Sequence, residues 1–141
     1  MRGINKYLAG SVLSLAMFFS PAVNAMQIPQ YDQMDYRDQG HYVTLLVKGV
    51  YENLIAQGET EQANKLLTFF QDGSDKGGPA QFSKNLEMAK ALNQQNAANP
   101  SNQKPVYEVE HAMALTLKNQ GIVVPVPTLL AINKDFHPAY R

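Results

Sequence analysis

The chain has 141 residues, with 12 Lys and Arg against 12 Asp and Glu, and no cysteine. The absence of cysteine excludes a disulfide scaffold and a lipid anchor on an N-terminal cysteine, so packing must stabilise the fold. The balanced charge argues against nucleic acid or an anionic membrane surface as the main partner, because both are bound through clustered basic residues.

The first 25 residues have the features of a cleavable secretory signal peptide. A short basic segment precedes an uncharged apolar run over residues 7–19, and Pro21 ends that run. Val23 and Ala25 lie at the two positions that a signal peptidase recognises, so we expect cleavage after Ala25. The apolar run is shorter than the about 20 residues that a membrane-spanning helix needs. The sequence therefore predicts a periplasmic protein, or alternatively a secreted one, with no stable membrane anchor after cleavage.

The residues that follow the cleavage site are expected to form one domain. Removing Arg2 and Lys6 leaves 10 basic against 12 acidic residues, a net charge of about −2. A chain of this length buries about 60% of its unfolded surface or more, which is enough for a core without disulfides. Residues 26–40 are polar and carry Pro29, which predicts an extended or poorly ordered lead-in. The single helical domain is then expected over residues 41–141.

Apolar residues at helical spacing predict four helices, over residues 41–57, 59–70, 79–92 and 105–120. Gly58 and Gly121 are expected to end the first and the fourth helix, because glycine tolerates the left-handed conformation of a C-cap. Pro79 and Pro105 are expected to begin the third and the fourth, because proline suits the first helical turn.

The connections between these helices differ in character. Residues 72–78 contain three glycines and no apolar residue and predict a loop, and residues 93–104 predict a solvated linker. Residues 122–127 are apolar but carry two prolines, which favours an extended segment laid over the helices, and a last short helix is expected over residues 128–134. The sequence thus predicts an all-α fold, a small bundle of four to five amphipathic helices.

Two acid–histidine pairs have the i, i+3 spacing with which a helix can present two ligands to one metal ion. They are Glu108 with His111 and Asp38 with His41. On the predicted fourth helix, Glu108 lies about 120° from the apolar stripe and His111 almost opposite it, so both are expected to face solvent. We therefore expect no metal and no other cofactor. A small-ligand or metal-binding bundle that uses His41, Glu108 and His111 is the alternative.

The sequence contains no recognisable catalytic motif. The glycine-rich loop lacks the Gly-Lys-Ser/Thr ending of a phosphate loop and the carboxylates of a calcium loop. Nucleophilic catalysis needs a nucleophile beside an oriented base, and nothing in the sequence brings the serines and histidines together. These residues are Ser74, Ser83, Ser101, His41, His111 and His137. We expect a protein without enzymatic activity, and a small periplasmic enzyme is the third hypothesis.

Two leucines, Leu45 and Leu115, lie off the apolar stripes of their predicted helices. Either residues 122–126 cover them, or they belong to an exposed patch that binds a partner. The full candidate patch consists of Leu45, Tyr107, Glu108, His111, Leu115, Phe136, His137 and Tyr140. The sequence therefore predicts an exported, non-catalytic protein that binds another exported or envelope protein, as an inhibitor, an immunity-type protector or an accessory of envelope assembly.

Overall fold

The structure, a computed structural model, describes residues 25–99 and 106–136. The described residues form six α-helices and no strand, which confirms the predicted all-α class. The helices are α1 (Ile28–Asp32), α2 (Tyr36–Ala56), α3 (Thr60–Gln71), α4 (Gly78–Ala98), α5 (Val109–Lys118) and α6 (Val126–Asn133). Of the expected signal peptide, residues 1–25, all but Ala25 lie outside the described residues. Among the helices described, none combines the length and the apolar character that crossing a bilayer requires.

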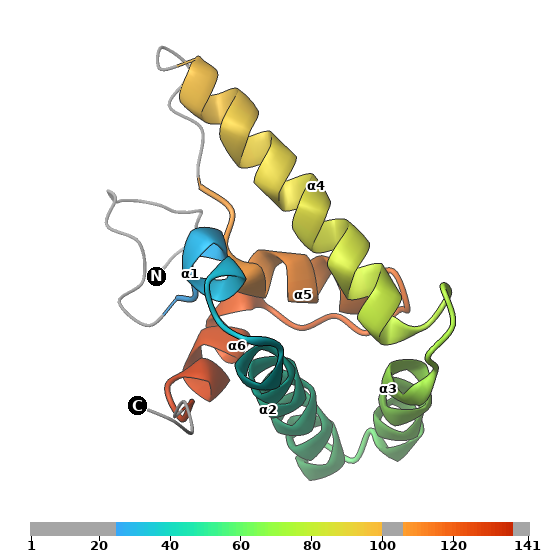
Figure 1. Cartoon of the computed structure of the whole chain (residues 1–141). Helices are drawn as coiled ribbons and strands as arrows, with labels where there is room; N and C mark the ends of the chain where they lie inside the picture. The colour runs from blue at the N-terminus through green and yellow to red at the C-terminus, as the bar shows by residue number, and fades with distance from the viewer. Residues whose placement is uncertain (1–24, 100–105, 137–141) are drawn as a thin grey trace.

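Five of the helices pack in a closed ring. Each helix from α2 to α6 contacts the next along the chain, and α6 returns to contact α2 (Figure 1). Figure 1 also shows that α4 is long and extends beyond the other helices at its C-terminal end. The inward faces of the ring share one hydrophobic core, whose fully buried members include Tyr42, Leu46, Leu66, Met113 and Leu129.

Two glycines end helices as the sequence predicts. Gly58 follows α2 and Gly121 follows α5, and both have a positive φ, of 78° and 79°. The next amide then donates back to a carbonyl five residues earlier, from Glu59 to Leu54 at 2.8 Å and from Ile122 to Leu117 at 3.0 Å. This is the Schellman arrangement, which satisfies carbonyls that the helix end leaves free.

The expected extended lead-in is wrong, because the segment carries a helix and is part of the core. Met26, Ile28 and Tyr31 are buried, and the amide of Val109 donates to the carbonyl of Met26 at 3.0 Å. A five-residue helix is too short to show an apolar period, so the segment carries no periodic signal. The first long helix, α2, also begins earlier than predicted, since the side chain of Asp35 caps it.

Two further boundaries differ from the sequence-based expectation. Helix α4 runs to Ala98 instead of ending near residue 92, and Asn93 within it binds the backbone of Tyr107 through two hydrogen bonds of 2.8 and 2.9 Å. Helix α5 begins at Val109, not at Pro105, which itself lies outside the described residues. Tertiary contacts therefore place these ends where the local sequence does not.

Candidate functional site

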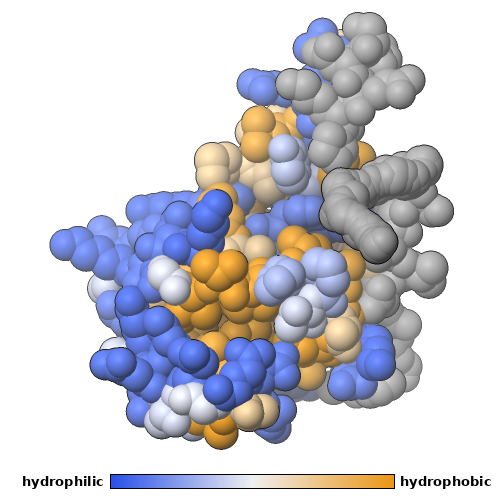
Figure 2. Space-filling view, turned by 180° about the vertical axis from the view of Figure 1, so that it is seen from behind, coloured by the Kyte–Doolittle hydropathy of each residue, from blue (hydrophilic) through white to orange (hydrophobic). Residues whose placement is uncertain are grey.

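Apolar side chains reach the surface of the molecule. Figure 2 shows one face on which hydrophobic side chains gather at the centre and hydrophilic ones line the rim. The most exposed large hydrophobic residues are Tyr36 at 90%, Val123 at 78% and Val106 at 61%. Apolar surface of this kind marks interaction sites when it is contiguous, which directs attention to the grooves of the molecule.

An apolar groove of about 850 Å³ lies between α2, α3 and α4, with a residue of α1 also lining it. Five aromatic side chains line it, and they are Tyr31, Tyr36, Tyr51, Phe70 and Phe82. Among the described residues of the lining, Lys48 carries a charge and no carboxylate is present. The groove is therefore an aromatic surface with one cation beside it.

The second apolar face of α2 forms one wall of this groove. Its lining residues recur at i, i+4, i+7, i+11 and i+15, which keeps them on one side of a helix. They are Tyr36, Gly40, Val43, Val47 and Tyr51. Tyr42, Leu46 and Val50 lie on the adjoining side of α2 and enter the core, each at most 1% exposed, and Val47 at the boundary is itself buried in that core. The apolar surface of α2 is thus wider than the part that the core covers.

Helices α3 and α4 build the opposite wall. Phe70 of α3 lies against the beginning of α4 at Gly78, where an added Cβ would come within 2.7 Å of the ring. The ring of Phe82 meets Tyr31 edge-on, with centroids 6.3 Å apart. These contacts fix the positions of two of the aromatic rings that line the groove.

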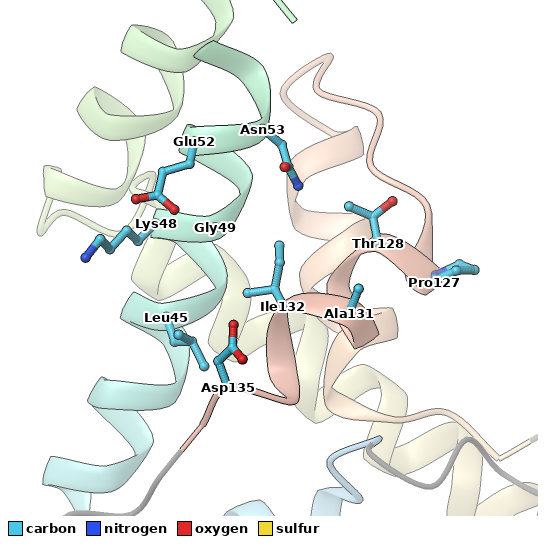
Figure 3. Close-up of a pocket in the computed structure, with 10 residues that line it drawn as sticks. All are labelled: Leu45, Lys48, Gly49, Glu52, Asn53, Pro127, Thr128, Ala131, Ile132 and Asp135. Atoms are coloured by element: carbon cyan, nitrogen blue, oxygen red, sulfur yellow. The ribbon is translucent and has the colours of Figure 1, made fainter. Parts of the chain in front are cut away.

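A second pocket, of about 580 Å³, lies between α2 and α6 and is more polar (Figure 3). Figure 3 shows Lys48 and Glu52 on α2, Thr128 on α6 and Ile132 between the two helices. Within residues 25–99 and 106–136, no three His, Cys, Asp or Glu side chains are grouped as a metal site would require. In Figure 3 the polar side chains of this pocket do not converge on a common point.

Glu110 is an acidic residue that the fold buries. Its side chain is fully buried and accepts hydrogen bonds from the Met26 amide at 3.1 Å, from Asn133 Nδ2 at 2.8 Å and from the Tyr42 hydroxyl. Burial raises the pKa of Glu110, and its hydrogen bonds oppose that rise. Asp38 is also fully buried, and neither of its carboxylate oxygens has a hydrogen-bond partner in the described structure.

The prediction that Glu108 faces solvent is wrong. Glu108 is 7% exposed and is the N-cap of α5, and Gln27 donates to its carboxylate at 2.9 Å. Its amide donates to Nδ1 of His111 at 2.9 Å, so that nitrogen carries no proton although the Glu108 carboxylate lies 3.7 Å away. Burial raises the pKa of Glu108 and lowers that of His111. The angular argument fails because α5 begins only after Glu108.

The structure brings together part of the predicted partner-binding patch. Tyr107, Glu108 and His111 meet at the start of α5, where the rings of Tyr107 and His111 are 5.6 Å apart. Leu115 is partly buried on α5, and Leu45 lines the pocket between α2 and α6. Phe136 packs edge-on against Tyr42 in the core, with centroids 5.0 Å apart. His137 and Tyr140 lie outside the described residues.

Sequence reasoning missed the aromatic groove, although a signal for it exists. The apolar spacing that starts at Tyr36 and passes through Gly40, Val43 and Val47 to Tyr51 is helical, but it begins before the predicted start of the helix at residue 41. Comparisons of the chain with protein-family models, with curated proteins and with solved structures give no match, so a function has to be assigned from the groove itself.

Proposed function

We propose that the protein is exported, is cleaved after Ala25, and acts without catalysis by binding another exported or envelope protein in the groove between α2, α3 and α4. The observation that carries this proposal is the aromatic groove itself, an apolar hollow whose floor includes buried core residues and whose lining includes the exposed ring of Tyr36. Such binding suits an inhibitor, an immunity-type protector or an accessory of envelope assembly.

The occupant that best fits the groove is an amphipathic helix of the partner. The wall that α2 provides, from Tyr36 to Tyr51, is about 22 Å long, which matches about four turns of a bound helix. Helices commonly bind in grooves through apolar residues at i, i+3, i+4 and i+7, and aromatic side chains contribute most of the energy at such interfaces. Lys48 favours a partner that carries a carboxylate beside its apolar face.

A second candidate function is the binding of a small apolar ligand in the same groove. Its volume of about 850 Å³ falls within the range of small-molecule sites. The two candidates predict different occupants of the purified protein. A bound helix retains a stoichiometric second polypeptide, whereas a bound small molecule is released on denaturation and extracted into organic solvent.

Charge placed in the groove tests the proposal. Gly40→Glu puts a carboxylate among the aromatic walls, and the fold tolerates it because nothing lies within 4 Å of the added Cβ. Tyr36→Ala removes an aromatic ring that is 90% exposed and so has little effect on stability. Ala91→Glu is the matched control, since Ala91 is exposed on α4 and does not line the groove.

Each variant is used to capture partners from an envelope extract of the native organism, and affinity is then measured with the purified partner. We expect one stoichiometric partner, bound at least about tenfold more weakly by Gly40→Glu and by Tyr36→Ala, and bound normally by Ala91→Glu. A partner that binds all four proteins equally, or an extracted small molecule in place of a polypeptide, contradicts the proposal.

A further inference from the structure

We infer that cleavage after Ala25 creates a buried structural cation, the α-ammonium group of Met26, which is bound by the carboxylate of Glu110. The inference depends on the cleavage that the proposed function includes, and it is independent of the groove. It assigns a role in folding to the chemical group that processing creates.

Backbone and side-chain contacts fix the position of Met26. Its side chain and that of Ile28 are buried, at 5% and 2% exposed. Its carbonyl accepts a hydrogen bond from the Val109 amide at 3.0 Å, and its nitrogen lies 3.1 Å from Oε1 of Glu110. The nitrogen atom that becomes the mature N-terminus is therefore already placed against a buried carboxylate, at a distance that suits an ion pair.

Glu110 has no ion-pair partner among residues 25–99 and 106–136. Its partners in the described structure are an amide N–H, a hydroxyl and a side-chain amide, and no Lys or Arg of the described residues pairs with it. An unpaired buried carboxylate is strongly unfavourable, whereas a paired and hydrogen-bonded one is tolerated. Cleavage converts the Met26 amide into an ammonium group, which adds one positive charge and two N–H donors at the same atom.

A second buried carboxylate, that of Asp38, lies on α2. Asp38 lies one turn before Tyr42 on the same face of α2, and the hydroxyl of Tyr42 binds Glu110. Both oxygens of Asp38 are buried and unpartnered within the described residues. The ammonium group thus adds a positive charge beside Glu110, in a fold that also buries the unpartnered carboxylate of Asp38.

The position of the cleavage site matters in this arrangement. Adjacent Cα atoms are about 3.8 Å apart, so an N-terminus one residue earlier or later places its ammonium group beyond contact with Glu110. A protein cleaved after Ala25 therefore gains an ion pair that the precursor lacks, and the precursor folds less stably than the processed protein.

The test uses the full chain, expressed with its own leader and purified after export. Intact mass identifies the N-terminus, for which we expect Met26. One Ser inserted between Ala25 and Met26 then displaces the ammonium group by one residue. We expect this insertion to lower Tm by roughly 10 °C in the otherwise native protein, because it separates a buried ion pair, and by less than about 3 °C in the Glu110→Gln background.

Glu108→Gln provides the matched control, since Glu108 is a neighbouring buried carboxylate that binds Gln27 and not Met26. In the Glu108→Gln background we expect the Ser insertion to lower Tm by the same amount as in the otherwise native protein. A second readout is labelling of the α-amine by an amine-reactive reagent. The amine is expected to react at least about tenfold more slowly in the native protein than in denaturant, and the insertion removes this protection.

The outcomes separate this inference from the proposed function. An N-terminus other than Met26 contradicts both the predicted cleavage and the ion pair. An N-terminus at Met26, with an insertion effect that is equal with and without Glu110→Gln, overturns the ion pair alone. If Glu110→Gln prevents folding, the labelling experiment on the protein without this substitution decides. An α-amine that reacts equally fast in the native and the denatured protein then overturns the ion pair.

Discussion

His111 makes the stability of the protein sensitive to mild acid. Burial lowers the pKa of its imidazole, and its Nδ1 accepts a hydrogen bond from the Glu108 amide, with the two nitrogens 2.9 Å apart. The unfolded chain therefore takes up the proton first, at its ordinary pKa of about 6.5. The free energy of unfolding contributed by His111 is fully present above that pH and decreases as the pH falls toward the folded pKa.

His111→Asn isolates this effect, because the Asn oxygen replaces Nδ1 as an acceptor and does not titrate. We expect the native protein to lose at most about 1 kcal/mol more than His111→Asn between pH 6.5 and 5.5, measured by urea unfolding, and less in proportion to solvent screening of the 36% exposed side chain. The raised pKa of Glu108 acts in the opposite sense, and it is common to both proteins. Parallel stability curves for the two proteins over this interval contradict the prediction.

The burial of Glu110 illustrates what a sequence conceals at the level of single residues. Glu110, Met113 and Leu117 are spaced at i, i+3 and i+7 and share one face of α5, and the two apolar residues are fully buried. That spacing indicates a buried carboxylate, but an acidic residue in a helix usually belongs to the solvated face. Its partners, Met26, Tyr42 and Asn133, lie far apart in the sequence, and only the fold brings them together.

Two glycines of α2 are expected to respond in opposite ways to alanine. Gly49 lies where α2 meets α6, and an added Cβ would lie 2.6 Å from Cγ2 of Ile132, a stiff β-branched side chain (Figure 3). Gly49→Ala should therefore destabilise the protein by about 1–3 kcal/mol. Gly40→Ala should stabilise it by about 0.5–1 kcal/mol, since the same helix gains a better helix former in open space.

Urea unfolding of both variants measures this contrast. Ile132→Ala removes the side chain that the added Cβ would meet. In the Ile132→Ala background, Gly49→Ala should therefore cost less stability than it does in the native protein. Equal effects of the two glycine substitutions would show that α2 and α6 do not approach closely at Gly49.

At the level of elements, apolar periodicity predicts the long helices but does not predict where some of them begin and end. The helices over residues 36–56 and 60–71 lie close to their predicted positions, because each carries a sustained apolar stripe and ends at a strong signal such as Gly58. α1 has too few residues for a stripe. The far end of α4 is polar and is kept helical beside the contact of Asn93 with Tyr107, a contact that local sequence does not predict.

The stability of the whole molecule depends on tertiary contacts more than on helix length. The contacts from α2 to α6 determine which apolar faces meet. Periodicity in the sequence does not say that one apolar side of α2 enters the core while the adjoining side lines the groove. Isolated short helices are marginal in water, so packing has to supply the stability of α1 and of the segment before it. Stability along the chain should therefore follow burial rather than helical length.

Amide hydrogen exchange tests this distribution of stability. α1 has five residues, yet Ile28 and Tyr31 are buried and the Val109 amide is bound to the Met26 carbonyl, so the amides of Tyr31 and Val109 should exchange only through global unfolding. The end of the much longer α4, residues 94–98, extends beyond the ring and is mostly exposed (Figure 1), so its amides should exchange at least about a hundredfold faster. Fast exchange at Tyr31 and Val109 would show that the N-terminal segment opens separately from the ring, and the ion pair inferred for Met26 would then contribute little to global stability.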